Sequence, residues 1–409
     1  MTSMVDALSH VAALRPKSGA RTGLRPDGVS HAREELVSLL GGREERNDRG
    51  NHFQVRRRFA GPAPEPLTPR AWNLVFPGVA PLPCDPAGWL FLDTETTGLS
   101  GGTGTCAFLV GVGWWEGDGF TVEQYFMRDY GEEPSLLEAL AERLDAHRVL
   151  VTYNGKSFDW PLLETRFRMA RFGAVPQPSV HLDLLYPARR LWRWSLESVA
   201  LAEVERHVLG FDRGGDIPSA SIPGRYFDFI RGGAAAPIAE VFRHNQMDLR
   251  GLAVLALRLD RILGDPEHSG CAGGELLGIA RMLQKSGEGA RARRLFRKSL
   301  EEGLPPGGRL CAERELALMA KRERDFTVSN RLWERLLSGS PEGLEAYEQL
   351  AMYHEHRARH PEKALDLVRE ALGRLQDRFR SGAMTEDRYR RWHARLCRRR
   401  ERLERKCLP

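Results

Sequence analysis

The sequence predicts a mixed α/β domain followed by an all-α region, and three observations support this. Between Trp89 and about Leu263, short apolar runs of bulky side chains alternate with amphipathic segments. From about Gly270 onwards, apolar residues recur only at helical spacing. The length of 409 residues suits two or three domains, and contents of 42% hydrophobic and 28% charged residues are typical of a soluble globular protein.

The first part of the chain is expected to be an extension of the α/β domain. Residues 1–50 are rich in Arg, Gly and Ser, with one possible helix at 31–40, so we expect much of this extension to be mobile. Residues 51–88 are interpreted as a connecting segment, in which 51–58 could form a strand. Its Pro-rich part is Gly61–Pro66.

Targeting signals and cysteine spacing give an expected location. The first 20 residues lack the apolar segment of a signal peptide, and no apolar run approaches the ~18 residues of a membrane span. The six cysteines are scattered, without the spacing of a zinc site. We therefore expect a cytoplasmic protein with no membrane association.

Three strands joined by short turns are expected at the start of the α/β domain. They are Trp89–Leu92 with the residues that follow it, Cys106–Trp115 and Phe120–Met127. Asp118-Gly119 is a hairpin signal between the second and third strands. Successive strands with short turns predict an antiparallel meander.

Helices and strands alternate after the meander. The expected elements are a helix from Pro134, a strand at 149–153, a helix at 158–172, a short strand or turn at 181–185, a helix from Ser195 and a long helix at 238–263. This order predicts a mixed five-stranded sheet with flanking helices, over residues 89–263.

Residues 270–375 fit a helical repeat of roughly 34 residues, the tetratricopeptide period. Phe296, Trp333 and Val368 occupy equivalent positions, 37 and 35 residues apart. The alternative is a helical bundle without repeats. In either case stacked helices offer a surface on which a protein partner could dock.

Residues 376–409 form a basic tail. From Leu375 to the end there are 12 Lys and Arg against 5 Asp and Glu, while the whole chain has a net charge of +6, so the rest is nearly neutral. Such a tail suits a phosphate backbone. The alternative is a solvated helix with Arg–Glu pairs such as Glu401 and Arg405.

Two carboxylates end the first strand of the domain. Asp93 and Glu95 are two residues apart, so they project from the same face of the strand. Two like charges held together at the end of a buried strand repel each other, and a divalent metal would offset the repulsion. The alternative is a solvated strand end with two acids by chance.

Two further segments carry similar side chains. Asp159 lies where a predicted strand gives way to a helix. His244 and Asp248 are four residues apart in the long helix and therefore share one face. Four acids from three separate elements suit a pair of metal ions ~3.5–4 Å apart, the arrangement used for phosphoryl chemistry. A histidine beside them could take a proton from water.

Three motifs together resemble a known family. Asp-x-Glu-Thr-Thr-Gly at 93–98, Tyr-Asn-Gly-Lys-x-Phe-Asp at 153–159 and His-Asn-x-x-Asp at 244–248 look like those of the DEDD exonucleases. These belong to the ribonuclease H-like superfamily. Within it the chain resembles the YprB-like branch over residues 50–375, and members of this branch often carry a C-terminal tetratricopeptide-like region.

The resemblance implies a fold, a cofactor and an activity. The fold is a ribonuclease H-like mixed five-stranded sheet with flanking helices. Two Mg²⁺ or Mn²⁺ ions would be bound by Asp93, Glu95, Asp159 and Asp248. The reaction would be 3′–5′ hydrolysis of the terminal phosphodiester of single-stranded DNA or RNA.

The resemblance also implies substrate-binding residues. Thr96, Thr97, Gly98 and Leu99 match the segment that holds the terminal nucleotide in such enzymes. Asn154 either contacts a nucleotide or only holds its turn. Lys156 either contacts a phosphate or is an ordinary exposed lysine.

The histidine departs from the family pattern. The fifth functional position of the family is a Tyr four residues before the last Asp, or a His five residues before it. Here His244 stands at the four-residue spacing. We expect His244 to be the general base. The alternatives are a structural hydrogen bond, or a water positioned by metal alone.

Two weaker candidates lie in the same domain. Asp183 is interpreted as a capping or buried hydrogen-bonded residue rather than a support for a metal. Trp192 and Trp194, among Arg189, Arg190 and Arg193, suit single-stranded nucleic acid, although a cover over the core is as plausible an explanation.

Two functions compete with a nuclease. One is a non-catalytic nucleic-acid-binding adaptor on the same fold, and the other is a protein-interaction scaffold. The complete set of four acids argues against the adaptor, because a binding module has no use for clustered negative charge facing a polyanion. A scaffold would tolerate replacement of Asp93 and Glu95.

Overall fold

The computed structural model describes residues 26–61, 64–79, 82–83, 85–98, 104–339 and 343–408. Half of the extension that we expected to be mobile, residues 1–25, therefore lies outside the described residues. The other half, residues 26–50, is mostly helix and strand, and its helix includes the one expected at 31–40. It forms helix α2 (Pro26–Leu40) and strand β1 (Arg43–Asn47), and the side chain of Leu36 in α2 is completely buried.

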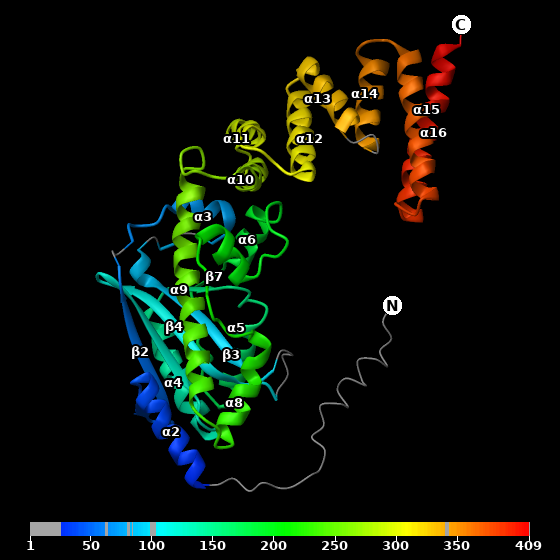
Figure 1. Ribbon diagram of the computed structural model, residues 1–409. Coiled ribbons are helices and arrows are strands. Elements are labelled where there is room, and N and C mark those ends of the chain that lie inside the picture. Colours follow the sequence, from blue (N-terminus) through cyan, green and yellow to red (C-terminus); the bar gives the residue numbers. More distant parts are fainter. Residues whose placement is uncertain are drawn as a thin grey trace.

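A mixed sheet forms the centre of the N-terminal domain (Figure 1). Its strands lie in the order β1-β2-β5-β4-β3-β6-β7. The pairs β1–β2, β2–β5, β5–β4 and β4–β3 are antiparallel, and the pairs β3–β6 and β6–β7 are parallel. The remaining strands are β2 (Gly50–Ala60), β3 (Trp89–Thr96), β4 (Ala107–Glu116), β5 (Gly119–Phe126), β6 (Val149–Thr152) and β7 (Val180–Asp183).

The predicted mixed sheet with flanking helices is confirmed, but the sheet has seven strands rather than five. The two additional strands, β1 and β2, form a hairpin, and β2 pairs with β5 in a register that sets Phe53 opposite Phe126. Phe53 and Val55 are buried. Residues that we interpreted as part of a connector thus extend the sheet and its core.

Helices cover both faces of the sheet, and each face has its own apolar core. One core includes Trp89 and Phe91, and the other includes Leu90 and Leu92, as the alternation of side chains along β3 requires. The covering helices are α3 (Pro69–Val75), α4 (Glu133–Ala146), α5 (Asp159–Met169), α6 (Leu185–Leu191), α7 (Leu201–Val204), α8 (Ile222–Ile230) and α9 (Ala236–Gly264).

Helix α9 runs the length of the domain, as Figure 1 shows. Its 29 residues correspond to roughly 43 Å at 1.5 Å per residue. The N-terminal half carries His244 and Asp248, and the C-terminal half leads to the all-helical region. Neither α9 nor another helix in the described ranges combines the length and the apolar composition of a membrane span.

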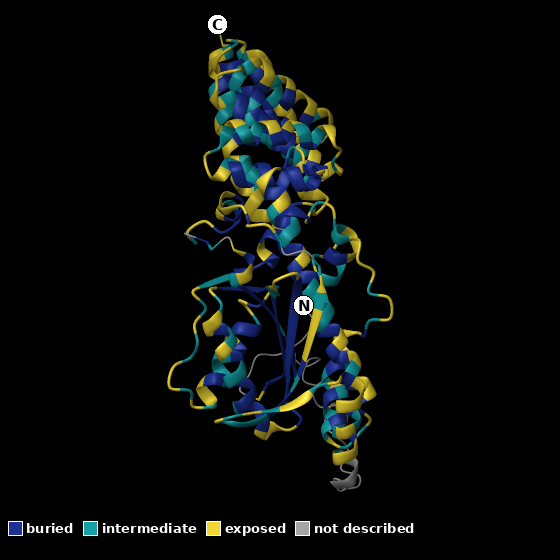
Figure 2. Ribbon diagram, turned by 90° about the vertical axis from the view of Figure 1, so that its left-hand side faces the viewer, coloured by how far each residue is buried: buried dark blue, intermediate teal, exposed yellow. Residues whose placement is uncertain are grey.

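The C-terminal region is all-α, as predicted. Neighbouring helices pack in chain order (Figure 1), with buried residues between them (Figure 2). Whether they are tetratricopeptide-like repeats stays a prediction. They are α10 (Gly273–Lys285), α11 (Gly289–Glu301), α12 (Pro306–Arg322), α13 (Phe326–Gly339), α14 (Leu344–His356), α15 (Pro361–Arg380) and α16 (Glu386–Cys407).

The two regions share one core at their junction. Trp192 and Leu276 belong to the same buried cluster, and Trp192 Nε1 donates to Glu275 Oε1 at 2.9 Å. Helix α10 lies very close to α6, because a Cβ at Gly278 would stand only 2.5 Å from the carbonyl oxygen of Arg190. These contacts fix the start of the helical region against the sheet domain.

The basic tail forms helix α16, which packs on α14 and α15. Leu396 and Leu403 of α16 are fully buried. Arg399, Arg402 and Lys406 all pair with Glu355 of α14, whose side chain has no exposed surface. These three cations of the tail therefore stabilise the fold, which favours the alternative of a helix with internal ion pairs.

Candidate active site

Strand β3 brings Asp93 and Glu95 to the edge of the sheet where the parallel strands end. Asp93 lies opposite Gly111 of β4, and a bulge between Glu95 and Thr96 ends the regular pairing. Glu95 is 9% exposed. The apolar residues before Asp93 are buried on both faces, so the strand is fixed in register and its two acids with it.

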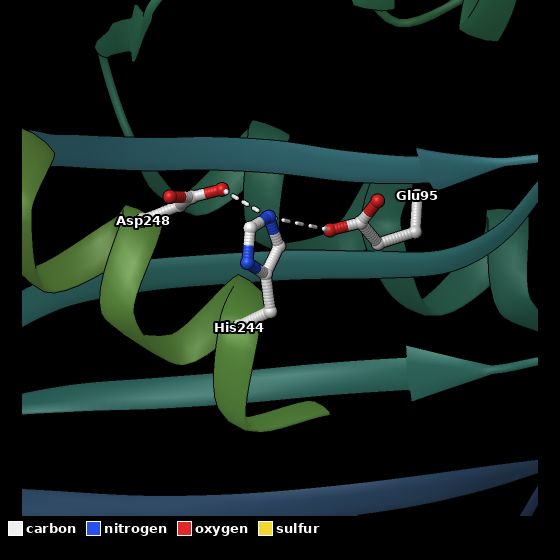
Figure 3. A group of neighbouring side chains, drawn as sticks. All are labelled: Glu95, His244 and Asp248. Carbon is white, nitrogen blue, oxygen red and sulfur yellow. Dashed lines mark ion pairs between the residues drawn. The ribbon is translucent and has the colours of Figure 1, made fainter. Parts of the chain in front are cut away.

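Helix α9 places His244 and Asp248 beside Glu95 (Figure 3). The Nε2 atom of His244 lies 3.8 Å from Oε1 of Glu95 and 3.4 Å from Oδ2 of Asp248. One ligand atom from each of the three side chains lies within 4.8 Å of the other two. Residues more than 140 positions apart thus converge in one small, buried group.

Asn245 holds Asp93 in place. Its Nδ2 donates to Oδ2 of Asp93 at 2.8 Å, and Nε2 of Gln124 donates to its Oδ1 at 2.8 Å. A Cβ at Gly111 would lie 2.1 Å from Asn245 Oδ1, so only glycine leaves room for this contact. The sequence analysis did not assign Asn245 a role. The available signals were the asparagine next to His244 and a glycine inside the apolar run of β4.

Asp159 joins the group from a third element. It is the first residue of α5 and is 7% exposed. Thr94 Oγ1 donates a hydrogen bond to Asp159 Oδ1. A carboxylate at the start of a helix is favoured by the positive end of the helix dipole.

Asp183 shapes the loop that leads to Asp159. It is buried, and its carboxylate accepts hydrogen bonds from the backbone N–H groups of Asn154, at 2.8 Å, and Lys156, at 3.1 Å. This agrees with its interpretation as a buried, hydrogen-bonded residue. Asn154 has a left-handed backbone with φ of 66°, and the side chains of Asn154 and Lys156 are exposed.

The buried carboxylates resist ionisation. Burial raises the pKa of Asp93 and of Glu95 well above the usual range, and repulsion from Asp248 raises both further. Burial raises the pKa of Asp159 to about 6, although the hydrogen bond from Thr94 opposes the change. Burial also raises the pKa of Asp248, against the attraction of His244 and Arg213.

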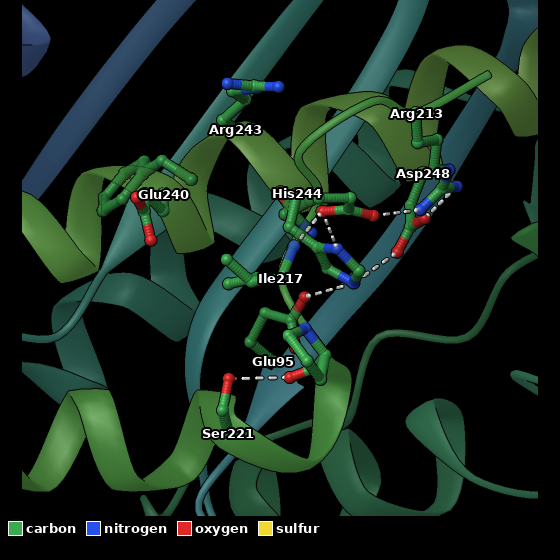
Figure 4. Close-up of polar contacts among 12 residues, drawn as sticks. Glu95, Arg213, Ile217, Ser221, Glu240, Arg243, His244 and Asp248 are labelled. Carbon is green, nitrogen blue, oxygen red and sulfur yellow. Dashed lines mark hydrogen bonds and ion pairs between the residues drawn. The ribbon is translucent and has the colours of Figure 1, made fainter. Parts of the chain in front are cut away.

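Arg213 lies beside Asp248 (Figure 4), and Asp216, from the same loop before α8, lies beside His244. Arg213 forms ion pairs with Asp248 and Glu205, and a third with Asp216 at 3.2 Å. Burial disfavours its charge, but these partners raise the pKa of Arg213 overall. A Cβ at Gly251 would collide with Glu205, so this glycine of α9 makes room for the pair.

Asp216 orients the imidazole of His244. Its Oδ1 lies 2.8 Å from Nδ1 of His244, which leaves Nε2 directed at Glu95 and Asp248. Burial raises the pKa of Asp216, but the hydrogen bond with His244, the charge of His244 and a hydrogen bond from Arg213 lower it overall. Neither Arg213 nor Asp216 was predicted from the sequence, because a polar loop far from the motifs gives no sign of where it folds.

These residues fit divalent cations. Asp93, Glu95, Asp159 and Asp248 are oxygen ligands of the kind that Mg²⁺ and Mn²⁺ prefer, and their mutual repulsion is what a divalent ion would relieve. Arg213 offsets part of the charge of Asp248, but it also pairs with Glu205 and Asp216. The acids therefore keep an excess of negative charge when ionised.

The predicted nucleotide-binding segment follows directly after Glu95. Thr96 Oγ1 donates to the carbonyl oxygen of Gly98 at 2.8 Å, and the backbone N–H of Thr97 donates to Cys106 O at 3.0 Å. The segment is thus held against the start of β4. Leu99 lies outside the described residues.

Comparisons with known proteins identify the family. Residues 90–259 match the model of the RNase H superfamily. The chain is also 33% identical over 289 residues to the uncharacterized protein YprB of Bacillus subtilis (strain 168), covering 69% of this chain and 68% of that protein. The chain belongs to the RNase H superfamily, and YprB is its homologue.

A solved structure gives a weaker likeness. The family B DNA polymerase from the hyperthermophilic archaeon Pyrobaculum calidifontis matches with a TM-score of 0.35 and 16% identity, over 57% of this chain. The match spans 34% of that polymerase chain. This likeness is too weak to support a conclusion about function.

Proposed function

We propose that the protein is a metal-dependent nuclease that hydrolyses single-stranded nucleic acid from its 3′ end. The observation that carries the proposal is the group of Glu95, His244 and Asp248, from β3 and α9, whose ligand atoms lie within 4.8 Å of one another. Asp93 lies on the same strand as Glu95, and Asp159 of α5 is near enough to raise, by its charge, the pKa of Asp93 and of Glu95. Arg213 pairs with Asp248 among these four acids, and burying the remaining carboxylates without an opposite charge destabilises a fold, so a structural role does not explain the group. Membership of the RNase H superfamily supports a nuclease.

The four carboxylates would hold two Mg²⁺ or Mn²⁺ ions. Such a pair supplies charge that stabilises the attacking and leaving oxygens of a phosphoryl transfer. The contribution of Asn245 is to orient Asp93, and that of Thr94 is to orient Asp159. Both hydrogen bonds fix ligand positions before a substrate arrives, which is the part that a protein plays in metal catalysis.

His244 would act as the general base. In the tautomer that carries its hydrogen on Nδ1, the imidazole donates to Asp216 and keeps a lone pair on Nε2. That atom faces the space between Glu95 and Asp248. A water between the carboxylates would then lie within reach of Nε2, so the four-residue spacing to Asp248 is compatible with this role.

The substrate end would lie over the segment after β3. We assign the terminal nucleotide to Thr96, Thr97, Gly98 and Leu99, and a neighbouring phosphate to Lys156. The exposed side chains of Asn154 and Lys156 on the loop held by Asp183 support this assignment. A single strand suits the site, because a terminal base can then separate from its neighbours.

A cleavage assay tests the proposal. Single-stranded DNA and RNA of 20 nucleotides, labelled at the 5′ end, are incubated with the protein and Mn²⁺ or Mg²⁺. We expect a ladder of products shortened from the 3′ end. We expect Asp93→Asn to lower the rate of cleavage at least ~10²-fold, because removing a metal ligand should lower the rate more than removing a group that only orients a ligand. An inert wild type with both metals and both substrates would refute the proposal.

A further inference from the structure

A basic pocket lies at the junction of the sheet domain and the helical region. It encloses about 430 Å³ between the segment around α3, helix α6 and helix α10. Its cationic lining comes from α6 and the residues that follow it, and from α10. The cations are Arg189, Arg190, Arg193, Arg281 and Lys285.

The lining of this junction pocket contains no acidic residue. In the described part of the chain, Arg193, Arg281 and Lys285 form no ion pair with an acid. The proximity of Arg281 contributes to lowering the pKa of Arg193, after the larger effect of partial burial. No acidic residue of the lining offsets the repulsion between Arg193 and Arg281, and a bound polyanion would do so.

The packing of the two regions creates this arrangement. Gly278 lets α10 approach the backbone of α6 at Arg190, while Arg190 Nη1 donates to the carbonyl oxygen of Val75 at 2.9 Å. Arg281 and Lys285 are four residues apart on α10 and so share a face. Two elements from different regions therefore direct their charges into one space.

The pocket also has surfaces for bases. Tyr186, at the start of α6, is 40% exposed and lines it. Trp194 is not part of the lining, but its ring centre lies 4.6 Å from the guanidinium of Arg193, which is. An aromatic ring such as that of Tyr186 beside a row of cations is a feature with which proteins bind single-stranded nucleic acid.

The pocket is close in the chain to the candidate active site. Helix α6 begins two residues after Asp183, whose carboxylate holds the loop at Asn154 and Lys156. Arg189 is near enough to that loop to oppose, by its charge, the rise in the pKa of Tyr153 that burial causes. A strand bound at the site could therefore continue into the pocket.

We propose that the junction pocket binds the phosphodiester backbone of the single-stranded substrate on the 5′ side of the scissile bond. This rests on the proposed function, because an enzyme that removes nucleotides from the 3′ end leaves the rest of the strand on that side. The pocket would then retain the strand after each nucleotide is released, and make long strands better substrates than short ones.

A binding experiment tests the pocket without cleavage. Fluorescence anisotropy of labelled single-stranded 20-mers, of DNA and of RNA, is measured with EDTA present, from 50 to 200 mM salt. The test variant is Arg193→Ala with Arg281→Ala. The control, Arg261→Ala with Arg297→Ala, removes the same charge from exposed positions outside the pocket.

We expect the test variant to bind several-fold more weakly at the lowest salt concentration. The slope of log K against log salt concentration should fall in magnitude by roughly 1.4, since each phosphate contact to a single strand contributes ~0.7. The control should bind like the wild type. Because the two guanidinium groups repel each other, their removal should not lower the thermal stability of the test variant. If that variant fails to fold, Arg281→Gln with Lys285→Gln replaces it.

Failure of this inference and failure of the proposed function are distinguishable. Pocket-dependent binding without any cleavage would overturn the nuclease and leave the pocket as a nucleic-acid site. Cleavage with unchanged affinity and unchanged salt slope in the test variant would overturn the pocket and leave the nuclease. Binding of free nucleotides by the pocket, but not of 20-mers, would also overturn the inference.

Discussion

At the scale of single residues, the site depends on side chains whose positions are set by other side chains. Asn245 orients Asp93, Thr94 orients Asp159, and Asp216 orients His244. The absence of a side chain at Gly111 leaves the space that the amide of Asn245 occupies. Orientation by a neighbouring polar group is what lets a carboxylate or an imidazole meet a metal or a water without rearrangement.

Kinetic measurements can distinguish the role of His244 from that of Asp216. If His244 is the base, His244→Ala should lower kcat by about 10²–10⁴-fold with little change in KM. Asp216→Asn should lower kcat less, because the imidazole remains and only its orientation suffers. Mn²⁺ affinity measured in parallel provides the control. If the loss of Mn²⁺ affinity in His244→Ala accounts for the whole loss of rate, the histidine only supports the metal site and is not the base.

At the scale of elements, helix α16 shows how charge can serve the fold. Three cations of α16 surround Glu355 of α14, at distances of 2.7–2.9 Å. Burial raises the pKa of Glu355, but hydrogen bonds from Arg402 and Lys406 outweigh it and lower the pKa to about 2. Three cations of the basic tail, which the sequence suggested for phosphate binding, thus form ion pairs within the protein.

The sign of the pH effect follows from that lowered pKa. A group that binds its proton less readily when folded stabilises the fold above its unfolded pKa, 4.5 for Glu355. This contribution is lost as pH falls from about 4.5 towards 2. We expect Glu355→Gln to lower the free energy of unfolding at pH 7 by roughly 1–3 kcal/mol, and to have less effect near pH 3.

A surface pair gives the matched control for α16. Glu386 pairs with Arg390 at 2.5 Å, but both side chains are more than half exposed. Glu386→Gln should therefore change stability by less than ~1 kcal/mol. Thermal or denaturant unfolding measures both variants. Equal effects of the two substitutions would contradict the structural role of Glu355.

At the scale of the whole molecule, the sequence supports some conclusions better than others. The helix expected from Ser195 was wrong, because residues 195–200 are not helical and α7 begins only at Leu201, and α6 and α8 were not predicted. The strands after Trp89 and helices α4, α5 and α9 were predictable, because apolar periodicity and turn residues are local signals. The hairpin of β1 and β2 was not, because its pairing with β5 depends on contacts between distant residues. The all-helical region was predictable, because helical periodicity is also a local signal. The close contact between Gly278 and Arg190 was not, because these residues are distant in the chain.

The same difference between local signals and long-range contacts applies to the residues of the site. Asp93, Glu95, Asp159, His244 and Asp248 could be named from motifs, and their convergence in space agrees with that choice, although their roles stay predictions. Arg213 and Asp216 could not be named, because charged residues in a loop are common and only the fold shows which face a buried acid. The exposed Arg297 and the pocket residue Arg281 likewise look alike in the sequence.

A calorimetric titration of the protein with Mn²⁺ determines whether the clustered carboxylates bind two metal ions. The wild type should bind two ions and release protons, because carboxylates with raised pKa values must lose any proton they hold to become ligands. Binding should weaken as pH falls towards 6, where the pKa of Asp159 lies. Asp93→Asn and Asp248→Asn should each lose at least one ion. A wild type that binds no Mn²⁺, or variants that bind it equally well, would contradict the account.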